Sequence, residues 1–198
     1  MAAIRAFIAI APDRAVREAL AHLRDQLRDG PGGGAGRWVR PESIHLTLKF
    51  LGDVPPERIP AIGHALETVC RGRSPFLLRL EGLGCFPNTR RPRVIWVGVR
   101  EETGVLAALQ RNLERDLERD LEALGHPRAF APHLTLARVR EGASLPAIQA
   151  LGQQVVARQP TPNLASAEML VREVILFRSD LLPQGPHYQA LQRATLGG

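Results

Sequence analysis

The chain has 198 residues, of which 44% are hydrophobic, and its formal net charge is +6. A chain of this length and composition suits one soluble globular domain or two small lobes. It contains no apolar run near the roughly 20 residues of a membrane span, and residues 1–11 lack the layout of a secretory signal. We therefore expect a cytoplasmic protein with no membrane partner. Cys70 and Cys85 are its only cysteines, too few for a disulfide framework or a zinc quartet.

The positive charge favours a polyanionic partner through long-range attraction. A second explanation is equally strong, because Lys49 is the only lysine and arginine supplies the other cations alongside abundant Ala, Gly and Pro. Such a bias can come from genome composition. Since the sequence also has no long basic run and no basic–aromatic interleave, charge alone does not predict a nucleic-acid surface.

The first third of the chain predicts strands alternating with helices. An apolar strand over Ile4–Ile10 is followed by apolar residues at helical spacing, namely Val16, Leu20, Leu23 and Leu27. The Gly-rich segment 30–36 lacks the Gly-Lys-Ser/Thr of a phosphate loop and leads into a strand, so we predict a flexible loop. A second helix follows Pro55-Pro56, and its predicted buried face contains Ile59, Ile62, Leu66 and Val69. This spacing leaves His64 facing solvent.

The middle of the chain predicts two strands, over Phe76–Leu80 and Val94–Val99, whose short separation favours antiparallel pairing. Cys85 and Arg91 lie in the loop between them at the spacing of a cysteine-dependent phosphatase loop. Such a loop needs successive backbone donors and usually a helix behind it, whereas Pro87 removes one donor and a strand comes next. We therefore reject this function and expect Cys85 to be packed or incidental.

The longest predicted helix follows Thr103, which we expect to cap it, and Gly125 ends it. Its buried stripe consists of Leu106, Leu109, Leu113, Leu117, Leu121 and Leu124. We expect the charged residues between these leucines to be solvated, namely Glu114, Arg115, Asp116, Glu118, Arg119 and Asp120.

The remaining predicted elements are a helix over residues 145–156 and strands near 163–168 and 171–177. The whole chain then has four helices and seven or eight strands. Because strands and helices are mixed with short returns, the order of elements favours an α+β fold with antiparallel sheets over a doubly wound parallel sheet.

One tetrapeptide occurs twice, as His45-Leu46-Thr47-Leu48 and as His133-Leu134-Thr135-Leu136. Each copy follows a proline and continues into apolar residues, so both are predicted strands. Alternation then places His and Thr of each copy on one face and the leucines on the other, with Phe50 joining the leucines in the core. A separation of 88 residues is too wide for a solenoid and indicates two similar half-domains that face each other.

Two imidazoles and two hydroxyls in one cleft fit the opening of a phosphodiester. One neutral and one protonated histidine supply the base and the acid near neutral pH, and the threonine hydroxyls donate to the phosphoryl oxygens. Metal ligation is the main competing role for a histidine pair, but no His, Cys or carboxylate cluster completes a ligand set near either copy, so we predict no metal and no cofactor. A packed histidine bonded to backbone is the other alternative, and the duplication argues against it.

The chain resembles the 2H phosphoesterase superfamily, and within it the RNA 2′,3′-cyclic phosphodiesterases, formerly called 2′-5′ RNA ligases. The paired His-x-Thr-x elements carry the resemblance, and further matching segments extend it over nearly the whole chain. These are Arg5-Ala6-Phe7-Ile8-Ala9, Trp38, Lys49-Phe50-Leu51-Gly52, Gly84-Cys85-Phe86-Pro87, Trp96-Val97-Gly98, Arg138 and Gly185-Pro186-His187-Tyr188.

The resemblance implies a single bilobal domain over residues 1–198. Each of its two pseudo-symmetric lobes would be an antiparallel sheet backed by helices, with the active-site cleft between the sheets. The first and last segments would share one lobe and the middle would build the other. A monomer acting on RNA or an oligonucleotide with a 2′,3′-cyclic phosphate end is the implied arrangement.

By the same resemblance, His45 is the proton donor to the leaving O3′ and His133 is the proton acceptor that activates water. Thr47, Thr135 and Arg138 would bind substrate. The symmetry of the pair leaves the reverse assignment of acid and base open. Strict alternation points Arg138 away from Thr135, so its role requires a bulge or a strand end nearby. Lys49 shares the predicted face of His45 and either adds positive potential or is a plain solvated lysine.

Two further functions stay open from the sequence. The same site could join RNA ends through a 2′-5′ linkage, or the His-Thr pairs could hold a terminal phosphate without turnover. Aromatic residues that could stack on a base, although core packing is the commoner role, are Phe7, Trp38, Phe130 and Tyr188. The remaining histidines, to which we assign no function, are His22, His64, His126 and His187.

Overall fold

The computed structural model describes residues 2–121, 129–159, 164, 167–182 and 185–197. Its strands are β1 (Ile4–Ile10), β2 (Gly36–Trp38), β3 (Leu46–Val54), β4 (Phe76–Phe86), β5 (Val94–Arg100), β6 (His133–Val139), β7 (Glu168–Val171), β8 (Glu173–Leu182) and β9 (Gly185–Thr195). Its α-helices are α1 (Arg14–Arg28), α2 (Ile59–Cys70), α3 (Val105–Leu121) and α4 (Leu145–Ala157). Short 3₁₀ turns span Gly33–Ala35, Pro41–Ser43 and Pro56–Arg58.

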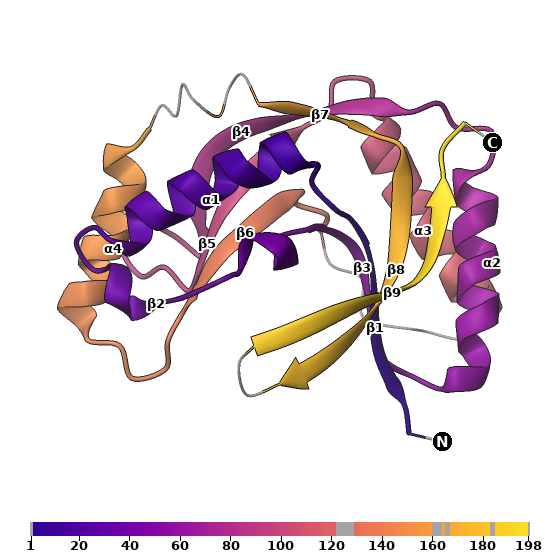
Figure 1. The fold of residues 1–198 in the computed structure, drawn as a ribbon, viewed down its shortest axis with the longest axis horizontal. Helices are drawn as coiled ribbons and strands as arrows, with labels where there is room; N and C mark the ends of the chain where they lie inside the picture. Colours follow the sequence, from indigo (N-terminus) through magenta and orange to yellow (C-terminus); the bar gives the residue numbers. More distant parts are fainter. Residues whose placement is uncertain (1, 122–128, 160–163, 165–166, 183–184, 198) are drawn as a thin grey trace.

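The strands form one curled antiparallel sheet in the order β7-β4-β5-β6-β3-β1-β8-β9, with β2 paired to β6 (Figure 1). Strands from the first and last parts of the chain (β3, β1, β8, β9) build one lobe. Strands from the middle (β6, β5, β4), together with β2 and β7, build the other. The α+β class with antiparallel pairing is therefore confirmed. The division of the chain is less simple than expected, because β2 from the first segment and β7 from the last segment pair with strands of the second lobe.

The helices that back the two lobes are exchanged between them. Helix α1 follows β1 of the first lobe but packs against β2, β6 and β7, while α3 follows β5 of the second lobe but packs against β3 and α2. Helix α4 lies on β4, and α2 lies on β8 and β9. In Figure 1, α1 and α4 accordingly lie at one side of the molecule and α2 and α3 at the other. Each lobe thus uses chain segments from both halves of the sequence.

The amphipathic periodicities are those expected from the sequence. In α1 the side chains of Val16, Leu20, Leu23 and Leu27 are all buried, and Asp13 caps the helix by accepting a hydrogen bond from the Val16 amide at 2.9 Å. The leucine stripe of α3 is buried through Leu117. Leu124 and Gly125 lie outside the described residues. His64 on α2 is exposed, as predicted.

Three expectations about α3 and its surroundings were wrong. Glu101, not Thr103, caps the helix: its carboxylate accepts hydrogen bonds from the backbone amides of Thr103 and Leu106. Asp116 is buried, with a relative exposure of 8%, and Glu114 forms an ion pair with Lys49. The charged run is therefore not uniformly solvated, because the helix lies against β3 closely enough to cover part of it.

The end of the chain is more regular than the sequence indicates. Most of the strand predicted near 163–168 lies outside the described residues, and the strand that the structure describes in this region is β7, from Glu168 to Val171. Strand β8 extends past Phe177 to Leu182, and β9 pairs with it along ten register positions of an antiparallel hairpin. Strand β9 was not predicted, because only small or polar residues alternate with its few apolar ones.

Candidate active site

Strands β3 and β6 meet where the two lobes join; β6 begins with the second tetrapeptide, and β3 begins at Leu46, directly after His45 of the first. A single register pair, Leu46 with Leu134, connects the strands, and both leucines have 0% exposure. Side chains alternate along a strand, so the neighbours His45, Thr47, His133 and Thr135 lie on the other side of the sheet. All four are partly exposed. The structure therefore brings the predicted histidines and threonines together.

A β-bulge follows the threonine in each copy. Ala9 pairs with Thr47 and Ile8 with Lys49, which leaves Leu48 unpaired. In the second copy Thr135 pairs with Trp96 and Ala137 with Ile95, which leaves Leu136 unpaired. Each bulge puts two consecutive residues on the buried face and reverses the alternation beyond it.

The bulge at Leu136 places Arg138 on the same face as His133 and Thr135. Leu136 and Ala137 both have 0% exposure, whereas Arg138 is exposed. The bulge that a role of Arg138 requires is thus present. The positive charge of Arg138 acts on two residues of the first lobe, since it lowers the pKa of His45 and opposes the burial that raises the pKa of Tyr188.

The bulge at Leu48 overturns the expectations for the two residues that follow it. Lys49 has 5% exposure and its Nζ lies 2.9 Å from Glu114 Oε1, so it neither shares the face of His45 nor is solvated. Phe50 is not in the core but is 58% exposed. It occupies in the first copy the position that Arg138 occupies in the second, with the same spacing of 88 residues. The prediction that Phe50 is in the core was wrong because it assumed an unbroken strand.

Both imidazoles are oriented by the same local hydrogen bond. His45 Nδ1 lies 2.9 Å from the carbonyl oxygen of Ser43, and His133 Nδ1 lies 2.6 Å from that of Ala131. A carbonyl oxygen only accepts, so Nδ1 carries the proton in each ring. In the neutral state Nε2 is therefore the free base, and in the protonated state it is a second donor.

Aromatic rings surround each histidine. The ring centroid of His45 lies 4.6 Å from that of Phe7 and 5.1 Å from that of Tyr188. His133 lies 5.2 Å from Phe86 and 6.2 Å from Trp96. These rings limit the motion of the imidazoles and remove water from around them.

The enclosure of His45 has an electrostatic consequence. Burial, together with the positive charges of Arg138 and His133, lowers the pKa of His45 to about 4 against the opposing effect of the hydrogen bond to Ser43. His45 is therefore neutral near pH 7 in the free protein.

Within the described part of the chain, the hydroxyl groups of Thr47 and Thr135 form no side-chain hydrogen bond. Each is one position along the same face from its histidine. Both hydroxyls are therefore free to donate to a ligand between the lobes.

The other aromatic candidates lie elsewhere or are covered. Phe7 has 3% exposure and lies beneath Tyr188 and Phe177. Trp38 and Phe130 pack against the hydrophobic core. Tyr188 is the one of the four that is partly exposed beside a histidine.

The remaining titratable candidates form no second site in the described residues. His22, His64 and His187 are exposed, and His126 lies outside the described residues. Cys70 and Cys85 are buried free thiols, and burial raises the pKa of both, that of Cys70 to about 11. Among residues 2–121, 129–159, 164, 167–182 and 185–197, no group of three His, Cys, Asp or Glu is placed to hold a metal ion. No helix in that part of the chain is long and apolar enough to cross a membrane.

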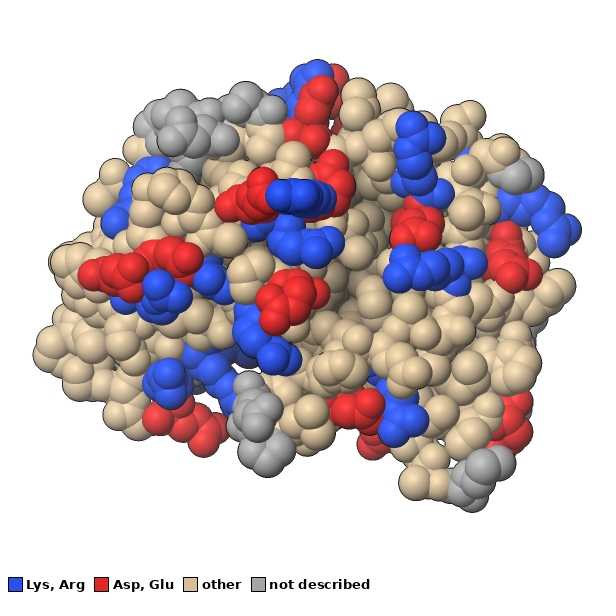
Figure 2. All heavy atoms as spheres, in the orientation of Figure 1, with Lys and Arg blue, Asp and Glu red and all other residues tan. Residues whose placement is uncertain are grey.

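Basic residues do not form one continuous surface in the view of Figure 2, where Lys and Arg side chains are interspersed with Asp and Glu. Several arginines are paired locally, for example Arg24 with Asp25 at 2.6 Å and Arg28 with Asp29 at 2.9 Å. Pairing of this kind compensates part of the positive charge locally.

Comparison with known proteins gives concordant results. Residues 10–96 match the family model described as LigT-like phosphoesterase. The RNA 2′,3′-cyclic phosphodiesterase of Archaeoglobus fulgidus is 35% identical over 96% of this chain and 98% of its own. That of Methanothermobacter thermautotrophicus is 33% identical over 96% of this chain and 97% of its own.

Solved structures share the fold over nearly the full length. The crystal structure of TT0787 of Thermus thermophilus matches with a TM-score of 0.78 and 30% identity, covering 98% of this chain and 99% of that one. The structure of E. coli LigT complexed with 3′-AMP matches with a TM-score of 0.74 and 29% identity, covering 99% of both chains. With its paired His-x-Thr strands at the junction of two lobes, the chain belongs to the LigT-like phosphoesterase family of the 2H superfamily.

Proposed function

We propose that this protein hydrolyses 2′,3′-cyclic phosphate ends of RNA to 2′-phosphates without a metal ion. The observation that carries the proposal is the matched pair of imidazoles, each with Nδ1 bonded to a backbone carbonyl and Nε2 free. Cyclic phosphate opening needs one proton taken from water and one given to the leaving oxygen. Two such rings supply both transfers, so the chemistry does not call for a metal-bound hydroxide.

In the proposed mechanism His133 Nε2 removes a proton from the attacking water, whose oxygen bonds to phosphorus. The bond from phosphorus to O3′ breaks, and His45 Nε2–H gives its proton to O3′. The family resemblance supports this assignment of the two roles. Thr47, Thr135 and Arg138 donate hydrogen bonds to the non-bridging phosphoryl oxygens, where negative charge grows in the transition state.

His45 must be protonated before it can act as the acid, although its pKa in the free protein is about 4. The anionic substrate resolves this difficulty, because a negative charge beside the ring favours the imidazolium. Substrate binding and protonation of His45 are then coupled. Arg138 opposes the protonation of His45 and at the same time attracts the anion that promotes it.

The relatives support the class of substrate. Several full-length relatives carry the name RNA 2′,3′-cyclic phosphodiesterase, and E. coli LigT was crystallised with 3′-AMP. Both histidines, both threonines and the arginine come from one chain, so the proposed site is complete in a monomer. We place the enzyme in the cytoplasm, where its free cysteines stay reduced.

The direct test is incubation of the purified protein, in excess chelator, with an RNA oligomer that ends in a 2′,3′-cyclic phosphate. We expect an oligomer with a terminal 2′-phosphate, at an unchanged rate when Mg²⁺ is added back. An untouched substrate, a 3′-phosphate product or joined strands would each overturn the proposed reaction. Loss of activity in chelator that Mg²⁺ or Zn²⁺ restores would overturn metal independence.

Variants of the pair test the mechanism. His45→Ala and His133→Ala should each lower turnover by roughly 10² to 10⁴, with unchanged circular dichroism. His64→Ala, on the exposed face of α2, is the matched control and should retain full activity. A variant of either predicted catalytic histidine that stays within tenfold of the parent would remove that residue from the mechanism.

A further inference from the structure

Arg37 lies on β2, directly opposite Arg138 on β6. The register of the two antiparallel strands pairs Arg37 with Arg138, and both side chains are exposed. Directly paired residues of adjacent strands point to the same face and have Cα atoms about 5 Å apart. The next pair, Trp38 with Ala137, lies on the other face, where Ala137 is fully buried. Arg37 therefore shares the face of Arg138, beside the candidate active site.

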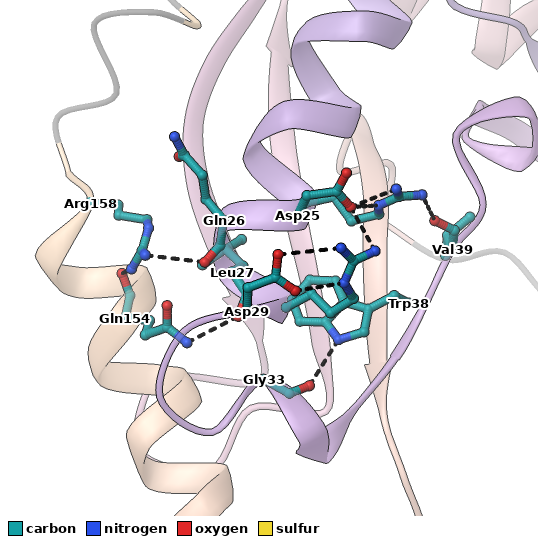
Figure 3. A network of polar contacts seen from close by, with 11 residues as sticks. Asp25, Gln26, Leu27, Asp29, Gly33, Trp38, Val39, Gln154 and Arg158 are labelled. Carbon is teal, nitrogen blue, oxygen red and sulfur yellow. Dashed lines mark hydrogen bonds and ion pairs between the residues drawn. The ribbon is translucent and has the colours of Figure 1, made fainter.

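The backbone on either side of Arg37 is held firmly. Trp38 Nε1 donates to the carbonyl oxygen of Gly33 at 2.8 Å, and Arg24 Nη1 donates to that of Val39 at 3.1 Å (Figure 3). The Val39 amide donates to Leu136, inside the second tetrapeptide, at 2.8 Å. This network fixes β2 against the strand of His133.

The loop before β2 is packed just as tightly. A Cβ on Gly33 would lie 2.0 Å from the carbonyl oxygen of Arg28. Gln154 Nε2 donates to Leu27 O at 3.1 Å (Figure 3) and to Pro31 O at 2.5 Å. The segment lacks a phosphate-loop helix, as predicted, but it is not the flexible loop that the sequence suggested, because it forms a 3₁₀ turn and Gly30, Gly32 and Gly33 pack closely against neighbouring atoms. The position of the Arg37 Cα is consequently as well defined as that of the sheet.

Arg37 and Arg138 form an uncompensated pair of like charges. Like charges directly opposite across two strands are destabilising, and within the described residues neither guanidinium has a hydrogen bond or a carboxylate at ion-pair distance. Other exposed arginines of this chain do have such partners, for example Arg79 with Glu168 at 3.1 Å. An anionic ligand that contacts both side chains would relieve the repulsion.

We propose that Arg37 binds the phosphodiester that precedes the terminal nucleoside, so that the enzyme selects RNA strands over cyclic mononucleotides. The inference rests on the proposed function, in which Arg138 holds the cyclic phosphate. The next negative charge along an RNA strand is the adjacent phosphodiester, and Arg37 presents an unpaired guanidinium beside Arg138 on that face. Its planar fork matches two phosphate oxygens, which makes arginine suited to this contact.

The test compares Arg37→Gln with the parent on two substrates, adenosine 2′,3′-cyclic phosphate and a five-nucleotide RNA that ends in a 2′,3′-cyclic phosphate. For the RNA we expect kcat/KM to fall about tenfold, mainly through KM, as for loss of one charge-assisted hydrogen bond. For the mononucleotide, kcat/KM should stay within twofold. The log–log salt dependence of kcat/KM for the RNA should lose about 0.7 of its slope, the value for one phosphate contact on a single strand.

Two further variants sharpen the comparison. Arg37→Lys keeps the charge but not the fork, so it should restore the salt slope and only part of the lost kcat/KM. Arg111→Gln removes an exposed arginine from α3, far along the chain from β2, and should leave both substrates unaffected.

The outcomes separate the two proposals. A parent inactive on both substrates overturns the proposed function, and the role of Arg37 with it. A parent that is active, combined with an Arg37→Gln variant that is equally impaired on both substrates or on neither, overturns the role of Arg37 alone.

Discussion

Binding of an anionic phosphate should raise the pKa of His45 by a large and measurable amount. In the free protein, burial and the positive charges of Arg138 and His133 hold this pKa at about 4. A phosphate monoanion hydrogen-bonded to Nε2 places its negative charge about 4 Å from the ring, which is worth about 4 kcal/mol at an effective dielectric constant of about 20. Since one pKa unit corresponds to about 1.36 kcal/mol, the rise is about three units.

The sign of the effect follows from the charge of the imidazolium, which the anion stabilises. If His45 is the acid, activity falls as pH rises through its pKa. The decline of kcat, which reports the substrate complex, should therefore lie at higher pH than the decline of kcat/KM, which reports the free enzyme.

NMR titration of the His45 ring measures this pKa directly, with and without saturating adenosine 2′-phosphate. His45→Ala identifies the resonance. Arg138→Gln should raise the pKa of His45 in the free protein, because it removes one of the positive charges that lower this pKa. A His45 pKa that is unchanged or lower in the complex would refute the coupling of binding to protonation. His45 could then not serve as the acid near neutral pH.

Other substitutions test the oxyanion donors and the support behind β3. Thr47→Val and Thr135→Val should each cost less transition-state stabilisation than the roughly 2.7–4 kcal/mol typical of a lone oxyanion donor, because Arg138 and the other hydroxyl also stabilise the charge. The ratio of kcat/KM between parent and variant measures this cost. A larger loss in one variant would show that the two hydroxyls do not stabilise the charge equally. Glu114→Ala should destabilise the fold by about 3–5 kcal/mol in urea unfolding, because it leaves the buried Lys49 ammonium unpaired, whereas Glu118→Ala on the exposed side of α3 should be nearly neutral. Burial alone would raise the pKa of Glu114, but hydrogen bonds from Lys49 and Gln110 outweigh burial and lower that pKa. The stabilisation by Glu114 is thus present above the ordinary pKa range of glutamate and is lost as pH falls through the lowered pKa. An equal effect of Glu114→Ala on unfolding free energy at about pH 3 and about pH 7 would contradict this linkage.

The sequence by itself determined the elements whose signals are local. Residues two apart in a strand share a face, so the repeat already placed His45 with Thr47 and His133 with Thr135. Helical spacing of apolar residues likewise identified the buried faces of α1 and α2. These patterns depend on neighbours within one or two turns or a few strand positions, which is why they survived in the folded protein.

The tertiary structure decided what lies beyond each tetrapeptide. Whether a strand bulges depends on the strand that it pairs with, and the partners of β3 and β6 lie tens of residues away in the chain. The two bulges reverse the alternation, and they thereby bury Lys49, expose Phe50 and place Arg138 beside the histidines.

The position of Arg37 on the same face has the same origin. Strand β2 has three residues and lies about a hundred positions before its partner, so no local pattern relates Arg37 to Arg138. The repeated tetrapeptide was enough to identify the two histidines. Their surroundings depend on the register between strands, which is determined only when distant segments of the chain pack against one another.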